Sequence, residues 1–372
     1  MISVSNLVEK EDASQILAKA ISTGAMPGAV FLTGNSDEII DERCLGNLTY
    51  AFDSPPTTSE TIYDLASLTK IIVTTPLAMI LYERGLLDLE APVKRYIPEF
   101  SGKEKDDVLV IDLLAHCSGL LWWTDLYKLA IDESVTITKQ RYIDHICELP
   151  LDYLPRSKSI YSDLGFLVLG EILERLTQSS LDQLFYDEIF KPLGMKDIQY
   201  RPSKVCHELI APTEKDPWRN CLLQGLVHDE NAFGLGGVAA HAGLFSTARA
   251  IAPLAQLFLQ DGTLNGKRLF SPETSHLFTT QSNIVHNSSR ALGWDTPDFG
   301  SSCGHFFSSK SYGHTGFTGT SLWLDKEKDF FVILLTNRVH PTRDNQKLAS
   351  VRPAFHDAIM IANEKNLDPA RE

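Results

Sequence analysis

The sequence lacks the features of a membrane-spanning or disulfide-rich protein. Its longest apolar run, residues 71–81, contains two threonines and a proline and is shorter than the roughly 20 residues that a helix needs to cross a bilayer. None of its six cysteines forms a CxxC pair, and a chain of 372 residues can bury a core without disulfides. We therefore expect no membrane span, and free thiols in preference to disulfides.

Positive charge is scarce as well. The chain has 34 lysines and arginines against 48 aspartates and glutamates, a formal net charge of -14, which would repel a phosphate backbone over most of the surface. Residues 9–12 are all charged, where an export signal would need an apolar stretch. We therefore expect a cytoplasmic protein that binds no nucleic acid.

The composition is that of a folded domain, with 43% hydrophobic and 22% charged residues. The positions of apolar residues, glycines and prolines predict helices with strands at both ends of the chain. This pattern predicts one domain assembled from both termini and an inserted helical domain. Pro76 should kink or interrupt the second helix. The expected helices are 11–23, 67–84, 111–115, 141–147, 164–176, 180–189 and 351–363, and the expected strands are 29–33, 39–45, 320–324 and 330–337.

The only SxxK sequence of the chain is Ser67-Leu68-Thr69-Lys70. In the first turn of the predicted helix, positions i and i+3 share a face, so the Lys70 amine can reach the Ser67 hydroxyl. A neutral Lys70 can accept the serine proton, and the free N–H groups of a helix start favour a developing oxyanion. The alternative is a surface serine that caps an exposed helix.

Two later segments can complete such a site. Tyr161-Ser162-Asp163 precedes an apolar helix, so its phenol can relay protons, although most tyrosines in such places only pack. His314-Thr315-Gly316 leads into a predicted strand, where an extended backbone can hydrogen-bond a substrate and donate to an oxyanion. The alternative for this segment is a glycine-bearing turn.

In this order, SxxK, Tyr-x-Asp and His-Thr-Gly resemble the three signature motifs of the penicillin-binding-protein and class C β-lactamase superfamily. The resemblance covers almost the whole chain, including residues 63–70, 83–89 and 113–120. Residues 225–232 and 241–247 resemble segments of one subgroup of these hydrolases, which includes a penicillin-binding-protein type 4B carboxypeptidase.

The resemblance implies an α+β fold, in which an antiparallel sheet flanked by helices is joined to an inserted, mostly helical domain. Residues 1–75 and 240–372 would form the discontinuous α/β domain. Residues 76–239 would form the helical domain, with the active site in the cleft between the two.

Carried over by position, the resemblance implies Ser67 as the acylated nucleophile, Lys70 as its activating partner and Tyr161 as a base or proton shuttle. It leaves open which of the last two takes the serine proton. The backbone N–H groups of Ser67 and Phe317 would form the oxyanion hole. No metal or organic cofactor is implied. The residues expected to contact the substrate are Asp163, His314, Thr315, Gly316 and Phe317.

Two positions depart from the pattern of the penicillin-binding members. Asp163 stands where they usually have Asn, and an ionised carboxylate cannot donate a hydrogen bond to a substrate amide. His314 replaces the usual Lys, and a neutral imidazole anchors a carboxylate less well. Asp163 near Lys70 would also raise the pKa of that amine and favour Tyr161 as the base.

Other residues in these segments have alternative explanations. His228, Asp229 and His241 are of the types that bind zinc, but no HExxH pair accompanies them. A role for His228 and Asp229 as a loop clamp and a role in contacting the substrate both remain open. The pair Trp122-Trp123 can line an acyl or sugar pocket or close a domain interface, and His116 is expected to be buried and hydrogen-bonded.

These observations predict a serine hydrolase with esterase-like activity on a small ester or amide. One alternative is a D-alanyl carboxypeptidase or weak β-lactamase that acts on muropeptide-like cell-wall fragments. The other is a catalytically silent binding protein of the same fold. The oligomeric state stays open.

Overall fold

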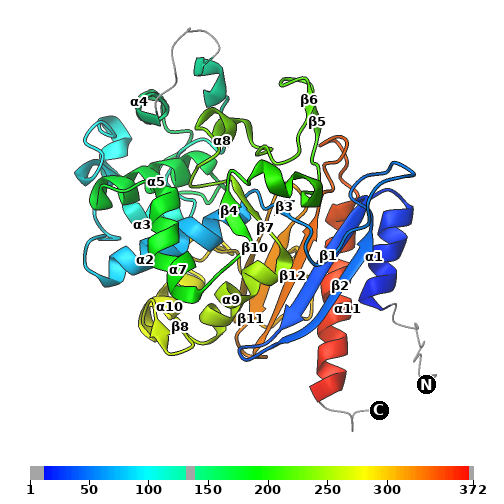
Figure 1. Ribbon diagram of the computed structural model, residues 1–372. Helices are drawn as coiled ribbons and strands as arrows, with labels where there is room; N and C mark the ends of the chain where they lie inside the picture. Colours follow the sequence, from blue (N-terminus) through cyan, green and yellow to red (C-terminus); the bar gives the residue numbers. More distant parts are fainter. Residues whose placement is uncertain (1–11, 131–138, 368–372) are drawn as a thin grey trace, which may run out of the picture.

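The computed structural model describes residues 12–130 and 139–367. At its centre lies a five-stranded antiparallel sheet in the order β10-β11-β12-β1-β2, which brings strands from both ends of the chain side by side (Figure 1). The sheet strands are β1 (Gly28–Gly34), β2 (Ile39–Gly46), β10 (Ser311–Thr315), β11 (Ser321–Asp325) and β12 (Phe330–Thr336).

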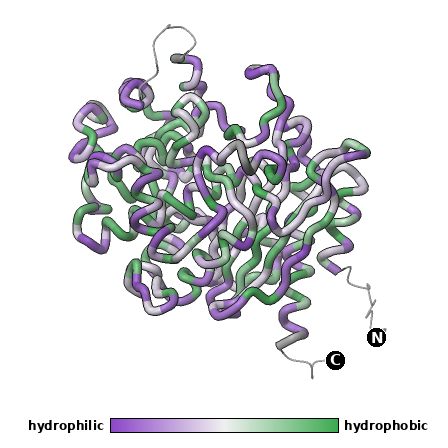
Figure 2. Tube along the Cα trace, viewed as in Figure 1, coloured by the Kyte–Doolittle hydropathy of each residue, from purple (hydrophilic) through white to green (hydrophobic). Residues whose placement is uncertain are grey.

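The sheet has a terminal helix pair on one face. Helices α1 (Ala13–Ser22) and α11 (Leu348–Leu367) contact each other there. A separate apolar core, which includes Leu17, Phe31 and Phe355, lies between these helices and the sheet. Every residue of β1 and β12 is buried because both faces of these central strands are covered. Figure 2 shows hydrophobic residues along the central strands and hydrophilic residues at many peripheral loops.

The other face of the sheet carries α9 (Ala248–Leu259), which packs on β1, β11 and β12. The larger apolar core begins here and continues into the helices between the two sheet-forming segments. The helices of this part are α2 (Thr75–Glu83), α3 (Val110–Leu114), α4 (Lys139–Glu148), α5 (Asp163–Thr177), α6 (Leu181–Phe185), α7 (Lys191–Leu193), α8 (Glu230–Gly234) and α10 (Pro272–Thr279).

Smaller elements connect these layers. The three-stranded sheet β3-β7-β4 joins β3 (Tyr63–Asp64), β7 (Leu244–Ser246) and β4 (Ile198–Tyr200), and it lies beside the candidate site. Two hairpins are formed by β5 (Lys215–Asp216) with β6 (Cys221–Leu222), and by β8 (Thr263–Leu264) with β9 (Lys267–Arg268). Two π-helices, Lys70–Thr74 and Tyr186–Phe190, and 3-10 turns at Val93–Arg95, Lys103–Asp107, Leu126–Ala130 and Lys204–Leu209 complete the described elements.

The fold prediction, an α+β fold with an antiparallel sheet flanked by helices, is confirmed. The predicted helix 67–84 is helical from residue 68 to residue 83, and Pro76 coincides with its irregular part: a π-helical turn at Lys70–Thr74 lies directly before the first turn of α2, which contains Pro76, and such a bulge accommodates a proline within a helix. Helices α9 and α10 and strand β10 were not predicted from the sequence.

Five of the six cysteines are free thiols in the structure, and Cys206 is the one whose side chain lies outside the described part. Among the described residues, no helix is both long and apolar enough to cross a membrane.

Candidate active site

Ser67 follows β3 at a strained turn. Its neighbour Ala66 has a φ of 47°, a left-handed conformation that costs a residue with a side chain free energy. The buried carboxylate of Asp64 holds this turn, because its Oδ1 accepts a hydrogen bond from the Ala66 N–H at 2.9 Å. The other oxygen accepts one from the N–H of His228 at 2.7 Å. Asp64 therefore fixes the nucleophile turn and the loop at His228 together.

The Lys70 side chain is fully buried and its ammonium has three partners. Nζ lies 3.1 Å from Ser67 Oγ, 2.6 Å from Asp163 Oδ1 and 3.1 Å from the carbonyl oxygen of His241. Burial lowers the pKa of Lys70, and the charge of Asp163 offsets this only in part. The predicted contact of Asp163 with Lys70 is present, and the carboxylate raises the pKa of the amine as expected, but desolvation outweighs it, so the pKa of Lys70 is lowered overall.

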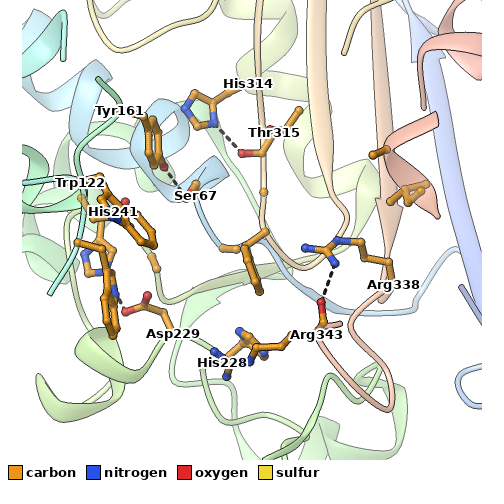
Figure 3. A pocket seen from close by; sticks show the side chains of 18 of the residues that line it. Ser67, Trp122, Tyr161, His228, Asp229, His241, His314, Thr315, Arg338 and Arg343 are labelled. Atoms are coloured by element: carbon orange, nitrogen blue, oxygen red, sulfur yellow. Dashed lines mark hydrogen bonds and ion pairs between the residues drawn. The ribbon is translucent and has the colours of Figure 1, made fainter. Parts of the chain in front are cut away.

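Tyr161 contacts the same serine from the other side. Its hydroxyl donates a hydrogen bond to Ser67 Oγ at 2.7 Å (Figure 3). Burial raises the pKa of Tyr161 well above its ordinary value, and the Asp163 carboxylate adds to the rise. The phenol is therefore neutral at pH 7 and can donate a proton.

His116 supports this tyrosine and is buried, as expected. The two rings lie 4.7 Å apart between centroids, and His116 Nδ1 accepts a hydrogen bond from the N–H of Ser162 at 3.0 Å. Ser162 in turn caps the first turn of α5 by accepting from the N–H of Gly165. These contacts place Tyr161 directly before α5 and Asp163 in its first turn.

The third motif lies at the end of β10, an edge strand of the large sheet. The turn that follows is tied to β3 by two hydroxyl groups, since Thr318 donates to the carbonyl of Asp64 and Thr320 donates to that of Leu65. A side chain at Gly316 would lie 2.4 Å from the Leu65 carbonyl oxygen. Only glycine allows this approach of strand to nucleophile turn.

His314 is buried, and burial lowers its pKa to about 3, with the positive charges of Lys70 and Arg290 adding to the effect. Its Nδ1 lies 2.7 Å from the carbonyl oxygen of Thr315. The imidazole is therefore neutral at pH 7, and it lacks the permanent charge of a lysine at this position.

The two residues whose amides are predicted to form the oxyanion hole lie at the same cavity. Ser67 and Phe317 both line it. Within residues 12–130 and 139–367, neither backbone N–H donates a hydrogen bond to another protein group. The arrangement can bind a negative oxygen beside the Ser67 hydroxyl.

The three residues considered as zinc ligands, His228, Asp229 and His241, do not form one cluster in the structure. His228 Nε2 lies 2.9 Å from Glu214, whereas His241 Nε2 lies 2.9 Å from Asp229. Asp229 and His241 do come together with Asp163 in a group whose ligand atoms lie within 4.8 Å of one another. Lys70 Nζ hydrogen-bonds to Asp163 Oδ1 and to the backbone carbonyl oxygen of His241, so one carboxylate of the group already has a cationic partner. Asp229 also caps the first turn of α8 and lines the cavity, so a structural role and a role in contacting the substrate both stay open.

The site opens into a cavity of about 660 Å³ whose lining includes Trp122, with 59% of its surface exposed, and Trp123. Reasoning from the sequence missed four arginines of this lining, because nothing in their spacing connects them with the three motifs. They are Arg290, Arg338, Arg343 and Arg352.

Comparison with known proteins agrees with this geometry. A family model described as "Beta-lactamase" matches residues 10–354. An "N-acetylmuramyl-L-alanine amidase" of Bacillus subtilis (strain 168) is 33% identical over 363 residues, which cover 88% of this chain and 80% of that protein. A "Putative D-alanyl-D-alanine carboxypeptidase" of Salmonella agona (strain SL483) is 35% identical over 320 residues, 78% of this chain and 72% of the relative.

Among solved structures, a mutant of simvastatin synthase from Aspergillus terreus superimposes with a TM-score of 0.72 at 21% identity, covering 97% of this chain and 99% of that one. This likeness concerns the fold. The family match spans most of the sequence, and the chain therefore belongs to the beta-lactamase family.

Proposed function

We propose that this protein is a serine hydrolase that forms an acyl-enzyme on Ser67 and releases it to water. The observation that carries the proposal is the pair of hydrogen bonds that Ser67 Oγ receives, from Lys70 Nζ at 3.1 Å and from the Tyr161 hydroxyl at 2.7 Å. A partly buried hydroxyl between an amine and a phenol is suited to lose its proton to one of these groups while the other group supplies a proton.

The direction of each pKa shift indicates which of the two partners serves as the base and which as the acid. The pKa of Lys70 is lowered by burial and that of Tyr161 is raised, so the neutral amine is the more accessible base and the neutral phenol the more accessible acid. Lys70 takes the serine proton while Oγ bonds to the carbonyl carbon, and the N–H groups of Ser67 and Phe317 hold the oxyanion. Tyr161 then protonates the leaving group as its bond to carbon breaks, and Lys70 returns a proton to Tyr161. In the second half of the reaction, a water molecule attacks the acyl-enzyme through the same proton transfers. This releases the carboxylic acid and restores the Ser67 hydroxyl.

The substrate class is an ester or amide that fits a cavity of about 660 Å³. Two relatives bear the names of an amidase and a carboxypeptidase of cell-wall type, which favours muropeptide-like fragments as a second candidate. We also propose that the site lies between a discontinuous domain of residues 1–75 and 240–372 and a helical domain of residues 76–239. The joining of terminal strands in one sheet supports this division.

The test is hydrolysis of p-nitrophenyl butyrate at neutral pH with EDTA present, by the wild type and by the Ser67→Ala variant. A matched control is Ser101→Ala, which removes an exposed hydroxyl outside the cavity. Mass spectrometry of the intact protein after rapid quenching would detect the acyl adduct.

We expect turnover and an adduct in the wild type and in the control, and neither in Ser67→Ala. Equal turnover by the wild type and Ser67→Ala would show that Ser67 is not the nucleophile. Loss of wild-type activity on addition of EDTA, with recovery in zinc, would replace the proposal by a metal mechanism.

A further inference from the structure

The ring of Phe317 is held by two neighbouring side chains. His228 stacks on it with 5.5 Å between the ring centroids and 29° between the planes, and the guanidinium of Arg338 lies 4.8 Å from its centroid. Both side chains lie at the cavity (Figure 3). Phe317 itself is 47% exposed and belongs to neither apolar core. These two neighbours, and not burial in the interior, therefore determine where the ring lies.

The backbone of Phe317 adds little to this support. In the turn around it, the Gly316 N–H donates to the carbonyl of Thr320 at 2.8 Å, and the Gly319 N–H donates to the carbonyl of Gly316 at 3.0 Å. Within the described part of the chain, neither the N–H nor the C=O of Phe317 bonds to another backbone group. A free N–H is what an oxyanion hole requires. It also means that no main-chain hydrogen bond fixes the direction of this amide.

His228 is a firmly anchored support for the ring. Its N–H donates to Asp64 Oδ2 at 2.7 Å, and its carbonyl oxygen accepts from Arg219 Nη2 at 2.7 Å. Its Nε2 lies 2.9 Å from Glu214 Oε2 and donates to it, because an ionised carboxylate only accepts hydrogen bonds. The side chain is also buried. The imidazole therefore cannot turn away from Phe317 without losing its bond to Glu214.

Glu214 connects this support to the segment that follows β12. Its Oε1 accepts a hydrogen bond from the Arg343 N–H at 3.0 Å, and its Oε2 accepts one from Arg343 Nε at 2.6 Å. The N–H of the next residue, Lys215, donates to the carbonyl of Pro341 at 2.9 Å. The same segment carries Arg338, so both neighbours of the Phe317 ring are tied to it.

We propose that His228 is a positioning residue that directs the Phe317 N–H into the oxyanion hole, with Glu214 holding the imidazole in place. The inference rests on the proposed function and adds a residue outside the three motifs to it. Asp64 bonds both to the Ala66 N–H in the nucleophile turn and to the His228 N–H. The two amides of the hole are therefore oriented relative to each other through this histidine. Its Nε2 is used by Glu214, so His228 acts through Phe317 and not by binding the substrate.

The first test measures kcat and KM for p-nitrophenyl acetate and p-nitrophenyl butyrate. His228→Gln removes the ring, but it keeps an amide that can bond to Glu214 and a backbone N–H that can bond to Asp64. The matched control is His305→Gln, which breaks an exposed histidine–carboxylate pair with Asp357 outside the cavity.

We expect His228→Gln to lower kcat by about tenfold or more for both esters, because a small displacement of an oxyanion donor weakens only the transition state. KM should change by less than about threefold, and the control should match the wild type. An unchanged kcat overturns the inference. A rise in KM that is larger for the butyrate ester, at constant kcat, also overturns it and makes His228 a residue that contacts the acyl chain.

Because His228 is buried, its variant can be unstable, and Phe317→Ala provides a second test. This change removes a half-exposed ring and keeps the amide, and it should also lower kcat by about tenfold or more. Adding His228→Gln to Phe317→Ala should then cost less than about threefold, because the two residues act through one contact. An equal loss from His228→Gln in both backgrounds would show a general structural role and overturns the inference.

A third measurement does not depend on ester turnover. Butylboronic acid forms a tetrahedral adduct with a nucleophilic serine, in which one oxygen occupies the oxyanion hole. In calorimetric titrations the wild type should bind it, with affinity reduced about tenfold or more in His228→Gln and in Phe317→Ala and unchanged in His305→Gln. Equal affinity in the wild type and His228→Gln, or no binding by the wild type, overturns the inference. The acyl adduct on Ser67 tests the proposed function separately, so the two can fail independently.

Discussion

Replacing Asp163 by asparagine should move the rising limb of the pH–rate profile to lower pH. The carboxylate oxygen lies 2.6 Å from Lys70 Nζ, and both side chains are nearly buried. Its negative charge keeps the proton on Lys70, which must lose that proton to act as a base. Asparagine has nearly the same shape and can still accept a hydrogen bond, but it carries no charge. The pKa of Lys70 should therefore fall further below its ordinary value.

The size of the effect follows from the contact. A direct opposite charge shifts a pKa by about 1–3 units, and each unit corresponds to about 1.4 kcal/mol. Desolvation already lowers the pKa of Lys70, and the charge of Asp163 opposes this, together with that of the more distant Asp229. We therefore expect the limb to move down by about 1–3 pH units, with a higher rate than the wild type on its acidic side.

The assay is kcat/KM for p-nitrophenyl butyrate across the pH range in which the protein stays folded, for the wild type and Asp163→Asn. Asp53→Asn is the control, because it removes an exposed carboxylate away from the cavity. An unmoved rising limb would refute the assignment of Lys70 as the base. A falling limb that moves down instead would show that Lys70 acts as an ammonium ion and that Tyr161 takes the proton.

Three further variants test other contacts. Tyr161→Phe should lower kcat by about 100-fold or more for an ethyl ester and by less for a p-nitrophenyl ester, whose leaving group needs no proton; equal losses would contradict the role as an acid. His314→Lys should increase labelling of Ser67 by a fluorescent penicillin, because a permanent charge replaces a neutral imidazole, and unchanged labelling would show that this position does not limit acylation. Glu214→Gln should reduce the acid sensitivity of folding: hydrogen bonds from His228 and Arg343 outweigh burial and bring the pKa of Glu214 to about 2, so the wild type loses about 3 kcal/mol between about pH 4.5 and 2. Urea unfolding at pH 5 and pH 3 measures this, and equal pH dependence in the two proteins would contradict it.

The sequence predicted the layout of the fold because each layer has its own local signal. Phe330–Thr336 is a continuous apolar run, as expected of a strand covered on both faces, and α5 has an apolar sequence after a serine cap. Helix α9 was missed although Thr247 caps it, with its hydroxyl accepting from the N–H of Ala250. Pro253 within the helix weakened the pattern, since proline usually interrupts helices.

The motifs identified the candidate reacting groups, whereas contacts between residues far apart in the sequence determine the pKa values of these groups. Ser67 and Lys70 share a helical turn, so their contact could be inferred from spacing. Asp163 is 93 positions from Lys70, and its presence in the second motif did suggest the ion pair. The burial that reverses its effect on the pKa of Lys70 depends on the packing of the whole core, which local patterns do not contain.

The arginines of the cavity show why charge at a site cannot be counted from motifs alone. In the pattern of the penicillin-binding members, the second and third motifs carry a neutral amide and a positive lysine. Here they carry the carboxylate of Asp163 and a neutral His314, so the two positions together are more negative by two charges. Arg290 and Arg338 bring guanidinium groups from other segments: Arg290 lies 5.6 Å from the centroid of the Tyr161 ring and pairs with Asp295, and Arg338 lies over Phe317. The charge of the site therefore depends on residues outside the three motifs, which only the fold brings to the lining of the cavity.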